Sequence, residues 1–307
     1  MAAPKPLRLT NPHAVLAALE HRPGAVREVQ LPPRGANDAW AEVAELARAQ
    51  DVPVEVLAAG RDDGPPDRDG GRGNDRGRGR HSGGQGGGQG GRGGQGGQGG
   101  RGQGRGGRDG HGGRGERGRG AATLSEQKDG RRGLACALVR PVEEARLGDL
   151  FADASERDGG HGLWVALDQV QDPRNLGAVM RSAAFFGAQG VVLTRDQSAP
   201  LSAVAYDTAS GGMECVPHAT VTNLRRALDN ARDAGLWILG AAGEAERDVA
   251  QVPRDRPWLL VLGNEERGLR RLTRENCDDV CRLTPRGGVD ALNVSAAAAA
   301  LLARLTV

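Results

Sequence analysis

The chain has 307 residues with a formal net charge of +2, and 38% of it is hydrophobic but only 3% aromatic. No stretch approaches the 18 or so apolar residues of a membrane span, and the opening MAAPKPLRLT lacks the apolar run of a secretory signal. Four scattered cysteines exclude a disulfide framework, so a reduced, cytoplasmic setting is expected. Cys277 and Cys281 have no further ligands nearby in sequence, which predicts buried structural thiols and no metal.

The first 63 residues predict a small α/β domain, because helical and strand patterns alternate along them. Helices are expected at 13–21 and 38–49, with strands at 26–31, 54–58 and, later, 134–139. We therefore predict an N-terminal α/β domain from residues 8–63 and 121–140, followed by a linker at 141–162.

Residues 64–120 interrupt this domain with a segment that is about half glycine. It contains 12 arginines and five acidic residues, which leaves the rest of the chain with a net charge of −5. Ordering a backbone costs about 1–2 kcal/mol per residue, and a segment with almost nothing apolar to bury cannot offset this cost, so we expect it to be disordered. Arginine among glycine suits a mobile contact with RNA, and a passive solubilising linker explains the composition equally well.

Residues 163–307 predict a larger α/β domain. Its strands are continuously apolar and are separated by helical stretches, which is typical of a parallel sheet covered on both faces. The predicted fold class is therefore doubly wound α/β. The strands are expected at 163–167, 190–194, 236–242, 258–263 and 281–285.

The first strand of this domain leads into the segment DQVQDPRNLGAVMRSAAFFG. Asp172 is a good N-cap and Pro173 suits the first helical position, so a helix is predicted to start here. Asn175 then lies in the first turn and Arg181 a little under two turns later. Gly177 removes a side chain beside Arg181, which we expect to let an RNA backbone approach. Taken alone, the segment is more typical of an ordinary amphipathic helix.

Two later segments also place polar side chains at the ends of apolar strands. In LVLGNEERGL, Gly263 and Gly268 flank polar residues, so a tight turn can direct backbone groups into a ligand pocket. In DALNVSAAAAALL, Asn293 and Ser295 stand at the head of an apolar helix, where capping explains either one alone.

Together, NLGAVMRSAAFFG, LGNEERGL and LNVSAA resemble the motifs of the SpoU/TrmH family of RNA ribose 2′-O-methyltransferases, of the SPOUT class, in order and spacing. The resemblance covers Leu163 to Leu305. More faintly, TNPHAVLAALE is similar to the opening of the ribosomal-protein-like RNA-binding domain in the family's 23S rRNA guanosine methyltransferase branch. Where that branch commonly has His-Gln-Gly, this chain has Arg131-Arg132-Gly133, and Glu266 stands where glycine is frequent.

The resemblance implies a C-terminal trefoil knot, a homodimer, and methyl transfer from S-adenosylmethionine to a ribose 2′-hydroxyl, in a guanosine of 23S rRNA. It implies that Arg181 contacts the target nucleotide and assists deprotonation, while Asn175, Glu265 and Asn293 organise the pocket. A guanidinium stays protonated, which suits Arg181 to stabilising an alkoxide, whereas Glu265 is the chemically easier proton acceptor; the sequence does not decide between them.

The resemblance also implies a hydrophobic slot with main-chain hydrogen bonds for the cofactor. Ordinary core packing is a second reading of Leu283 and Leu292. The expected cofactor residues are Leu262, Gly263, Asn264, Gly268, Leu283, Leu292 and Ser295, and the expected RNA contacts are Arg181, Arg131 and Arg132.

Three other functions fit parts of the sequence. A non-catalytic RNA-binding protein has no reason to keep four polar residues in apolar surroundings. A nucleotide-dependent dehydrogenase needs GxGxxG after its first strand, and that fingerprint is absent after residues 163–167. The tRNA-modifying branch of the same family remains open, and the separate N-terminal domain argues against it by analogy.

Overall fold

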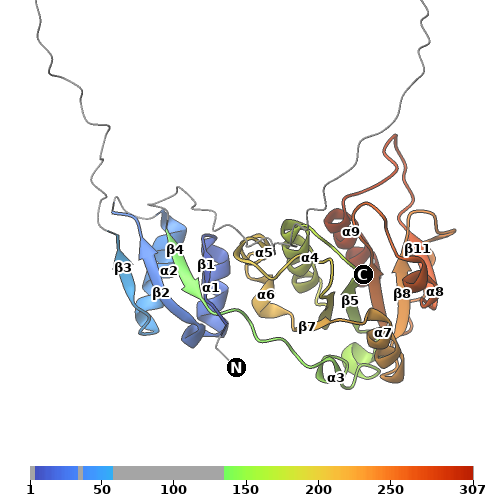
Figure 1. The fold of residues 1–307 in the computed structure, drawn as a ribbon, viewed down its shortest axis with the longest axis horizontal. Coiled ribbons are helices and arrows are strands. Elements are labelled where there is room, and N and C mark those ends of the chain that lie inside the picture. Colours follow the sequence, from blue (N-terminus) through green and yellow to red (C-terminus); the bar gives the residue numbers. More distant parts are fainter. Residues whose placement is uncertain (1–3, 34–36, 58–134, 307) are drawn as a thin grey trace, which may run out of the picture. The chain divides into compact units, whose positions relative to one another are not determined.

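A computed structural model of the protein describes residues 4–33, 37–57 and 135–306 (Figure 1). The expected insert at 64–120, together with Arg131 and Arg132, lies outside these ranges. Within the described ranges, no helix combines the length and the apolar character that crossing a membrane requires.

A four-stranded sheet forms near the N-terminus, in the order β1-β4-β2-β3. Strand β4 is antiparallel to both of its neighbours, and β3 is parallel to β2. Two helices accompany the sheet, and each begins at an asparagine whose side chain accepts a backbone N–H, as an N-cap does. The elements are β1 (Leu7–Leu9), α1 (Pro12–His21), β2 (Val26–Leu31), α2 (Asp38–Ala49), β3 (Val54–Val56) and β4 (Cys136–Val139).

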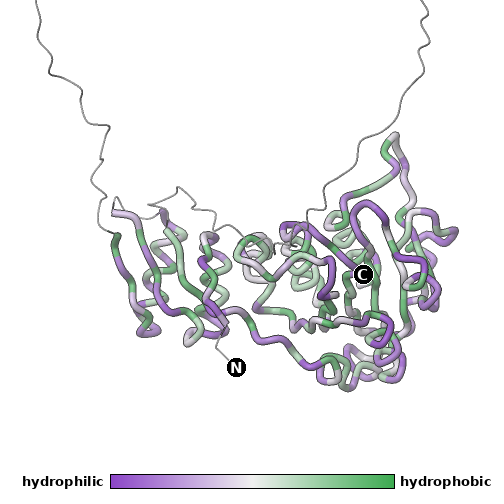
Figure 2. The backbone as a smooth tube through the Cα atoms, in the orientation of Figure 1, coloured by the Kyte–Doolittle hydropathy of each residue, from purple (hydrophilic) through white to green (hydrophobic). Residues whose placement is uncertain are grey.

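The C-terminal half contains a seven-stranded sheet in which every pairing is parallel, as predicted. The strand order is β7-β6-β5-β10-β8-β11-β9. Strands β5, β6 and β10 are buried along their whole length, and Figure 2 shows hydrophobic residues concentrated along the strands. The strands are β5 (Leu163–Leu167), β6 (Gly190–Thr194), β7 (His218–Val221), β8 (Trp237–Ala241), β9 (Arg247–Asp248), β10 (Trp258–Leu262) and β11 (Asp279–Arg282).

Helices cover both faces of this sheet. Alternate residues of β5 point to opposite faces: Val165 belongs to a core shared with α4, α5, α6 and α9, and Trp164 to a core shared with α3 and α7. The predicted doubly wound arrangement is therefore found. The helices are α3 (Leu147–Leu150), α4 (Pro173–Phe185), α5 (Ala203–Ala209), α6 (Gly212–Cys215), α7 (Leu224–Asp233), α8 (Arg271–Glu275) and α9 (Val294–Thr306).

The last predicted strand differs from the structure. It was expected at 281–285, but β11 spans Asp279–Arg282. Pro285 has no backbone N–H to give to a neighbouring strand, and the chain after Arg282 leaves the sheet. This departure frees residues 283–293 to form a loop at the carboxyl edge of the sheet.

Candidate active site

Helix α4 starts where the sequence predicts. The Asp172 side chain accepts the backbone N–H of Arg174 at 2.8 Å, and Pro173 occupies the first helical position. Asn175 follows in the first turn with only 9% of its surface exposed. A buried amide side chain needs partners, and its partner comes from a distant part of the chain.

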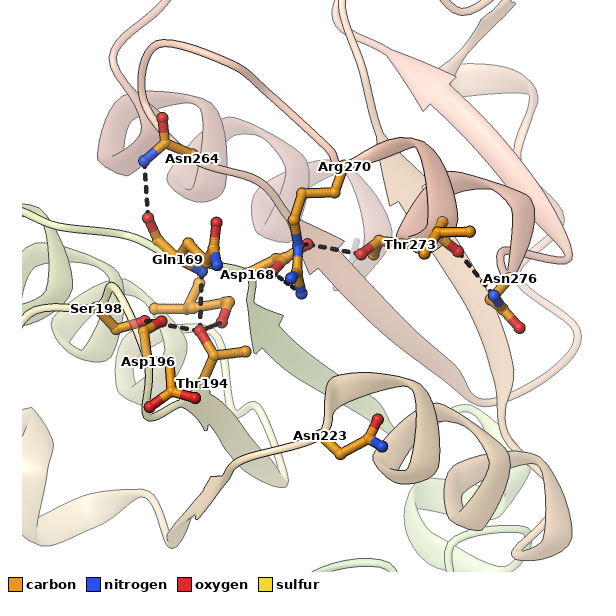
Figure 3. A network of polar contacts seen from close by, with 12 residues as sticks. Asp168, Gln169, Thr194, Asp196, Ser198, Asn223, Asn264, Arg270, Thr273 and Asn276 are labelled. Carbon is orange, nitrogen blue, oxygen red and sulfur yellow. Dashed lines mark hydrogen bonds and ion pairs between the residues drawn. The ribbon is translucent and has the colours of Figure 1, made fainter.

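That partner is Glu265, which follows the carboxyl end of β10. Asn175 Nδ2 donates to Glu265 Oε1 at 3.0 Å, and the backbone N–H groups of Gln171 and Asp172 donate to the same carboxylate at 3.2 Å. Asn264, the preceding residue, donates from Nδ2 to the carbonyl of Gln169 at 2.8 Å (Figure 3). The turn after β10 thus holds the loop that enters α4, and two of the three motifs meet.

The hydrogen bonds around Glu265 decide its ionisation. Burial by itself raises the pKa of this carboxyl, but the hydrogen bond from Asn175 and those from backbone N–H groups outweigh burial and hold the pKa below its ordinary value. A carboxylate kept ionised by three or more donors has few lone pairs left for a proton. Its geometry therefore suits holding the loop better than accepting a proton from substrate.

A tight turn follows Asn264, as predicted. Asn264 and Gly268 exchange two backbone hydrogen bonds of 3.1 and 2.9 Å, and Gly268 has a left-handed φ of +65°. A Cβ on Gly263 would lie 2.2 Å from the carbonyl carbon of Gly268, so the two backbones can approach only because residue 263 has no side chain.

A cavity of about 430 Å³ opens beside this turn, at the carboxyl ends of β8, β10 and β11. This is the edge at which parallel α/β sheets bind ligands. The predicted cofactor residues that line it are Leu262, Gly263, Asn264, Gly268, Leu283 and Leu292, and Glu265 lines it as well. The sequence prediction omitted the contribution of Ala241, Ala242 and Gly243, although their place at a strand's carboxyl end was a signal for it.

The loop between β11 and α9 forms one wall of the cavity with apolar side chains that face water. Val289 is 72% exposed and Leu292 is 57% exposed. Leu292 is therefore not a core residue, so the interpretation of core packing is wrong for it. It holds in part for Leu283, which is half-buried and packs against the main core.

Asn293 and Ser295 do not reach the Asn175–Glu265 pair. Asn293 Oδ1 accepts from the backbone N of Ser295 at 2.8 Å and from its Oγ at 2.6 Å, so the two residues cap α9. Ser295 is not among the residues that line the cavity. Asn293 is exposed and stands between two lining residues, Leu292 and Val294, at the cavity's edge.

Arg181 lies on the exposed side of α4, away from the cavity lining. Within the described ranges, no hydrogen bond or ion pair involves its side chain. One turn further along the helix, Phe185 is 81% exposed. Arg181 and Phe185 therefore share a helix face that one copy of the described chain leaves open to solvent.

Gly177 was expected to let an RNA backbone approach beside Arg181, and this expectation was wrong. A Cβ at this position would lie 2.4 Å from the carbonyl oxygen of Ala205 and 2.7 Å from Cβ of Thr208. Gly177 is buried and lets α4 pack closely against α5, so it offers no surface for an RNA backbone.

The two cysteines with CxxxC spacing agree with the prediction of structural thiols. Burial raises the pKa of both Cys277 and Cys281 to about 12, so both stay protonated. In the described part of the chain, no three side chains of His, Cys, Asp or Glu are grouped to hold a metal ion.

Comparisons with known proteins agree with the geometry. Residues 162–303 match the model of the SpoU rRNA Methylase family. Over 149 residues the chain is 44% identical to the 23S rRNA (guanosine-2'-O-)-methyltransferase RlmB of Pseudomonas aeruginosa, covering 48% of this chain and 60% of that protein. Over 167 residues it is 42% identical to an uncharacterized tRNA/rRNA methyltransferase of Mycolicibacterium vanbaalenii, covering 54% of this chain and 53% of the relative. The chain thus spans less than two thirds of either relative.

Solved structures share the fold. The SpoU methyltransferase AviRb from Streptomyces viridochromogenes aligns with a TM-score of 0.62 at 19% identity, over 98% of this chain and 89% of that one. The AdoMet-bound rRNA methyltransferase from Sinorhizobium meliloti aligns with a TM-score of 0.59 at 18% identity, over 98% of this chain and 87% of that one. At such identities the likeness concerns the fold alone.

Proposed function

We propose that the protein belongs to the SpoU rRNA methylase family, whose model matches residues 162–303, and that it methylates RNA. The donor is S-adenosylmethionine, the acceptor is a ribose 2′-hydroxyl, and the substrate is 23S rRNA, at a guanosine. The observation that carries the proposal is the hydrogen bond between Asn175 and Glu265, 90 residues apart in sequence, at the rim of a cavity.

The cavity fits the proposed donor. Its volume of about 430 Å³ lies in the range of small-molecule sites. Its walls combine apolar side chains, Leu262, Leu283 and Leu292, with glycine backbone at Gly263 and Gly268, which suits an adenosine held by a hydrophobic slot and main-chain hydrogen bonds. When bound, S-adenosylmethionine supplies the electrophilic methyl group.

The residues around the cavity contribute mainly orientation. An in-line displacement depends on alignment of the reacting atoms, and Asn175, Asn264 and Glu265 fix the loop entering α4 relative to the cavity. In this proposal Asn293 holds the opposite rim, at the start of α9. Because Glu265 is held by several donors, we assign stabilisation of the developing alkoxide to Arg181, while the proton of the 2′-hydroxyl passes to water.

The position of Arg181 supports the proposal of a homodimer. Its helix face, which also presents Phe185, is open in one copy and separate from that copy's cavity. We propose that this face packs on a second copy, so that Arg181 approaches the partner's cavity. A chain that sediments as a monomer and stays fully active on dilution contradicts this arrangement.

Arg181→Ala tests the proposed role directly. The variant is expected to lose at least 100-fold in kcat, the scale of removing one preorganised group that stabilises transition-state charge. The fold of each copy should be retained, because the Arg181 side chain makes no hydrogen bond or ion pair within one copy of the described chain, and circular dichroism checks this. Arg181→Lys keeps the charge but not the planar fork and should recover only part of the rate. Tritium transfer to RNA measures both variants, and near-normal turnover of the alanine variant refutes the role.

The finer architecture belongs to the same proposal. We assign residues 8–63 and 121–140 to a ribosomal-protein-like RNA-binding domain, with Arg131 and Arg132 among its RNA contacts, and 163–307 to a SPOUT domain that ends in a trefoil knot. A cytoplasmic location accords with an rRNA substrate. The tRNA-modifying alternative predicts label in tRNA when total RNA from a strain lacking the protein is methylated and the labelled ribose is mapped.

A further inference from the structure

A second cavity lies outside the site described above. Its volume is about 570 Å³, and it lies between the start of α7 and helix α8. It shares no lining residue with the first cavity. It is lined by Thr222, Asn223, Leu224, Arg225, Leu228, Arg270, Arg271, Leu272, Thr273 and Asn276.

The lining is cationic and rich in hydrogen-bond donors. Arg225 comes from α7, whereas Arg270 and Arg271 stand at the start of α8. Among the described residues that line the cavity, none is acidic. Glu275 pairs with Arg271 at 2.6 Å, but both side chains are more than half exposed, and such a pair is screened by water and salt.

A buried carboxylate anchors the Arg270 side chain. Asp168, at the end of β5, is 0% exposed, and its carboxylate meets Arg270 Nε at 3.0 Å and Nη2 at 2.6 Å (Figure 3). Thr273 Oγ1 donates to the same carboxylate at 2.7 Å. The Arg270 side chain remains 47% exposed. A guanidinium fixed on one side and open on the other loses little conformational entropy when it binds an anion.

Anchoring α8 to the sheet explains the Asp168–Arg270 pair by itself. It does not explain why a third arginine faces the same cavity from a different helix. Asn223 and Asn276 also line the cavity, although each has a local role. Asn223 Oδ1 accepts the backbone N–H of Arg226 at 3.1 Å, and Asn276 Nδ2 donates to the Leu272 carbonyl at 2.7 Å; Figure 3 labels both side chains. Guanidinium groups that converge from separate elements are typical of a phosphate-binding surface.

The two cavities open at the same edge of the sheet. Thr222 directly follows the carboxyl end of β7, and the first cavity lies at the carboxyl ends of β8, β10 and β11. The first cavity is lined by α9 and the second by α7, which cover opposite faces of the sheet, so an RNA whose target nucleotide reaches the mouth of the first cavity has to cross this edge to reach the second. A free nucleotide is a poorer match. Side chains that can donate hydrogen bonds to a phosphate dominate this lining, and none of the lining residues is aromatic, so none can stack on a base.

We propose that this second cavity binds backbone phosphates of the RNA substrate, away from the nucleotide that is methylated. The inference rests on the proposed function and extends it to substrate positioning.

The test is RNA binding by the full chain carrying Arg225→Gln and Arg271→Gln together. Arg270 is left intact because its removal strands a buried carboxylate. Fluorescence anisotropy with 23S rRNA transcribed in vitro should show Kd raised about tenfold at 0.1 M salt. The slope of log K against log salt should fall by about one for each arginine replaced. At saturating RNA, kcat should stay unchanged while KM rises.

Arg226→Gln is the matched control for Arg225→Gln measured alone. Each removes one charge from α7 at adjacent positions, and Arg226 does not line the cavity. Equal losses in these two single variants, or unchanged RNA binding by the double variant, overturn the proposal. Guanosine 5′-monophosphate that binds the wild type but not the double variant, with RNA affinity unaltered, also overturns it in favour of a free nucleotide. Fluorescence anisotropy measures RNA binding without methyl transfer. A wild-type chain that binds RNA but transfers no methyl group therefore contradicts the proposed function without contradicting the phosphate-binding cavity.

Discussion

At the scale of single residues, a substitution of Glu265 can distinguish a role in holding the loop before α4 from a role as catalytic base. Glu265→Gln keeps the shape but loses the charge that Asn175 and the backbone of Gln171 and Asp172 hydrogen-bond, so we expect a loss of about 1–2 kcal/mol in the free energy of unfolding at pH 7. A carboxyl with a lowered folded pKa contributes stability above its ordinary value of 4.5 and loses it as pH falls through the folded pKa. Urea titrations should therefore show the difference between wild type and variant shrinking below about pH 4.5. The pH profile of kcat should keep its shape; loss of a titrating limb would make Glu265 the base instead.

At the scale of elements, the contact of α4 with α5 depends on one missing side chain. Gly177→Ala gains about 1 kcal/mol in helix propensity but forces a methyl group to within 2.4 Å of the Ala205 carbonyl oxygen, so net destabilisation is expected, with a lower Tm. Gly148→Ala in α3 is the control, because a Cβ there meets nothing within 4 Å, and it should be neutral or slightly stabilising. A Gly177→Ala variant with normal Tm but weakened RNA binding would restore the surface role that the sequence had suggested.

At the scale of the whole molecule, charge is unequally divided. Outside residues 64–120 the chain has a net charge of −5, so attraction to RNA cannot come from its overall charge. Deleting residues 64–120 should leave the thermal unfolding of the remainder unchanged, since they contain almost nothing to bury. It should also weaken RNA binding and flatten its salt dependence, because 12 arginines are lost. Unchanged affinity and salt dependence would identify the segment as a passive linker.

The sequence predicts most of the sheet because its strands carry strong local signals. The apolar runs at 163–167 and 190–194 became β5 and β6 without change, and Asp172-Pro173 marked the start of α4. The short strand β7 was missed, since HATV lacks the continuous apolar run of its neighbours and alternates polar and apolar residues over only a short stretch.

The site was predictable as a set of segments, but its contacts were not. Nothing in the local pattern indicates that Glu265 accepts from the loop before Asn175, or that Gly177 faces α5, because both depend on how elements 30 to 90 residues apart come together. The second cavity escaped prediction for the same reason: Arg225 and Arg270 belong to segments that read separately as ordinary solvated helix ends.

The wall of the first cavity that contains Val289 and Leu292 has an energetic consequence. Both side chains are largely wetted in the protein alone, at 72% and 57% exposure, while the loop that carries them has no regular secondary structure. A small molecule seated against them removes this apolar surface from water, so its association should carry a negative heat-capacity change. The heat capacity of binding therefore reports how much of this wall a ligand covers.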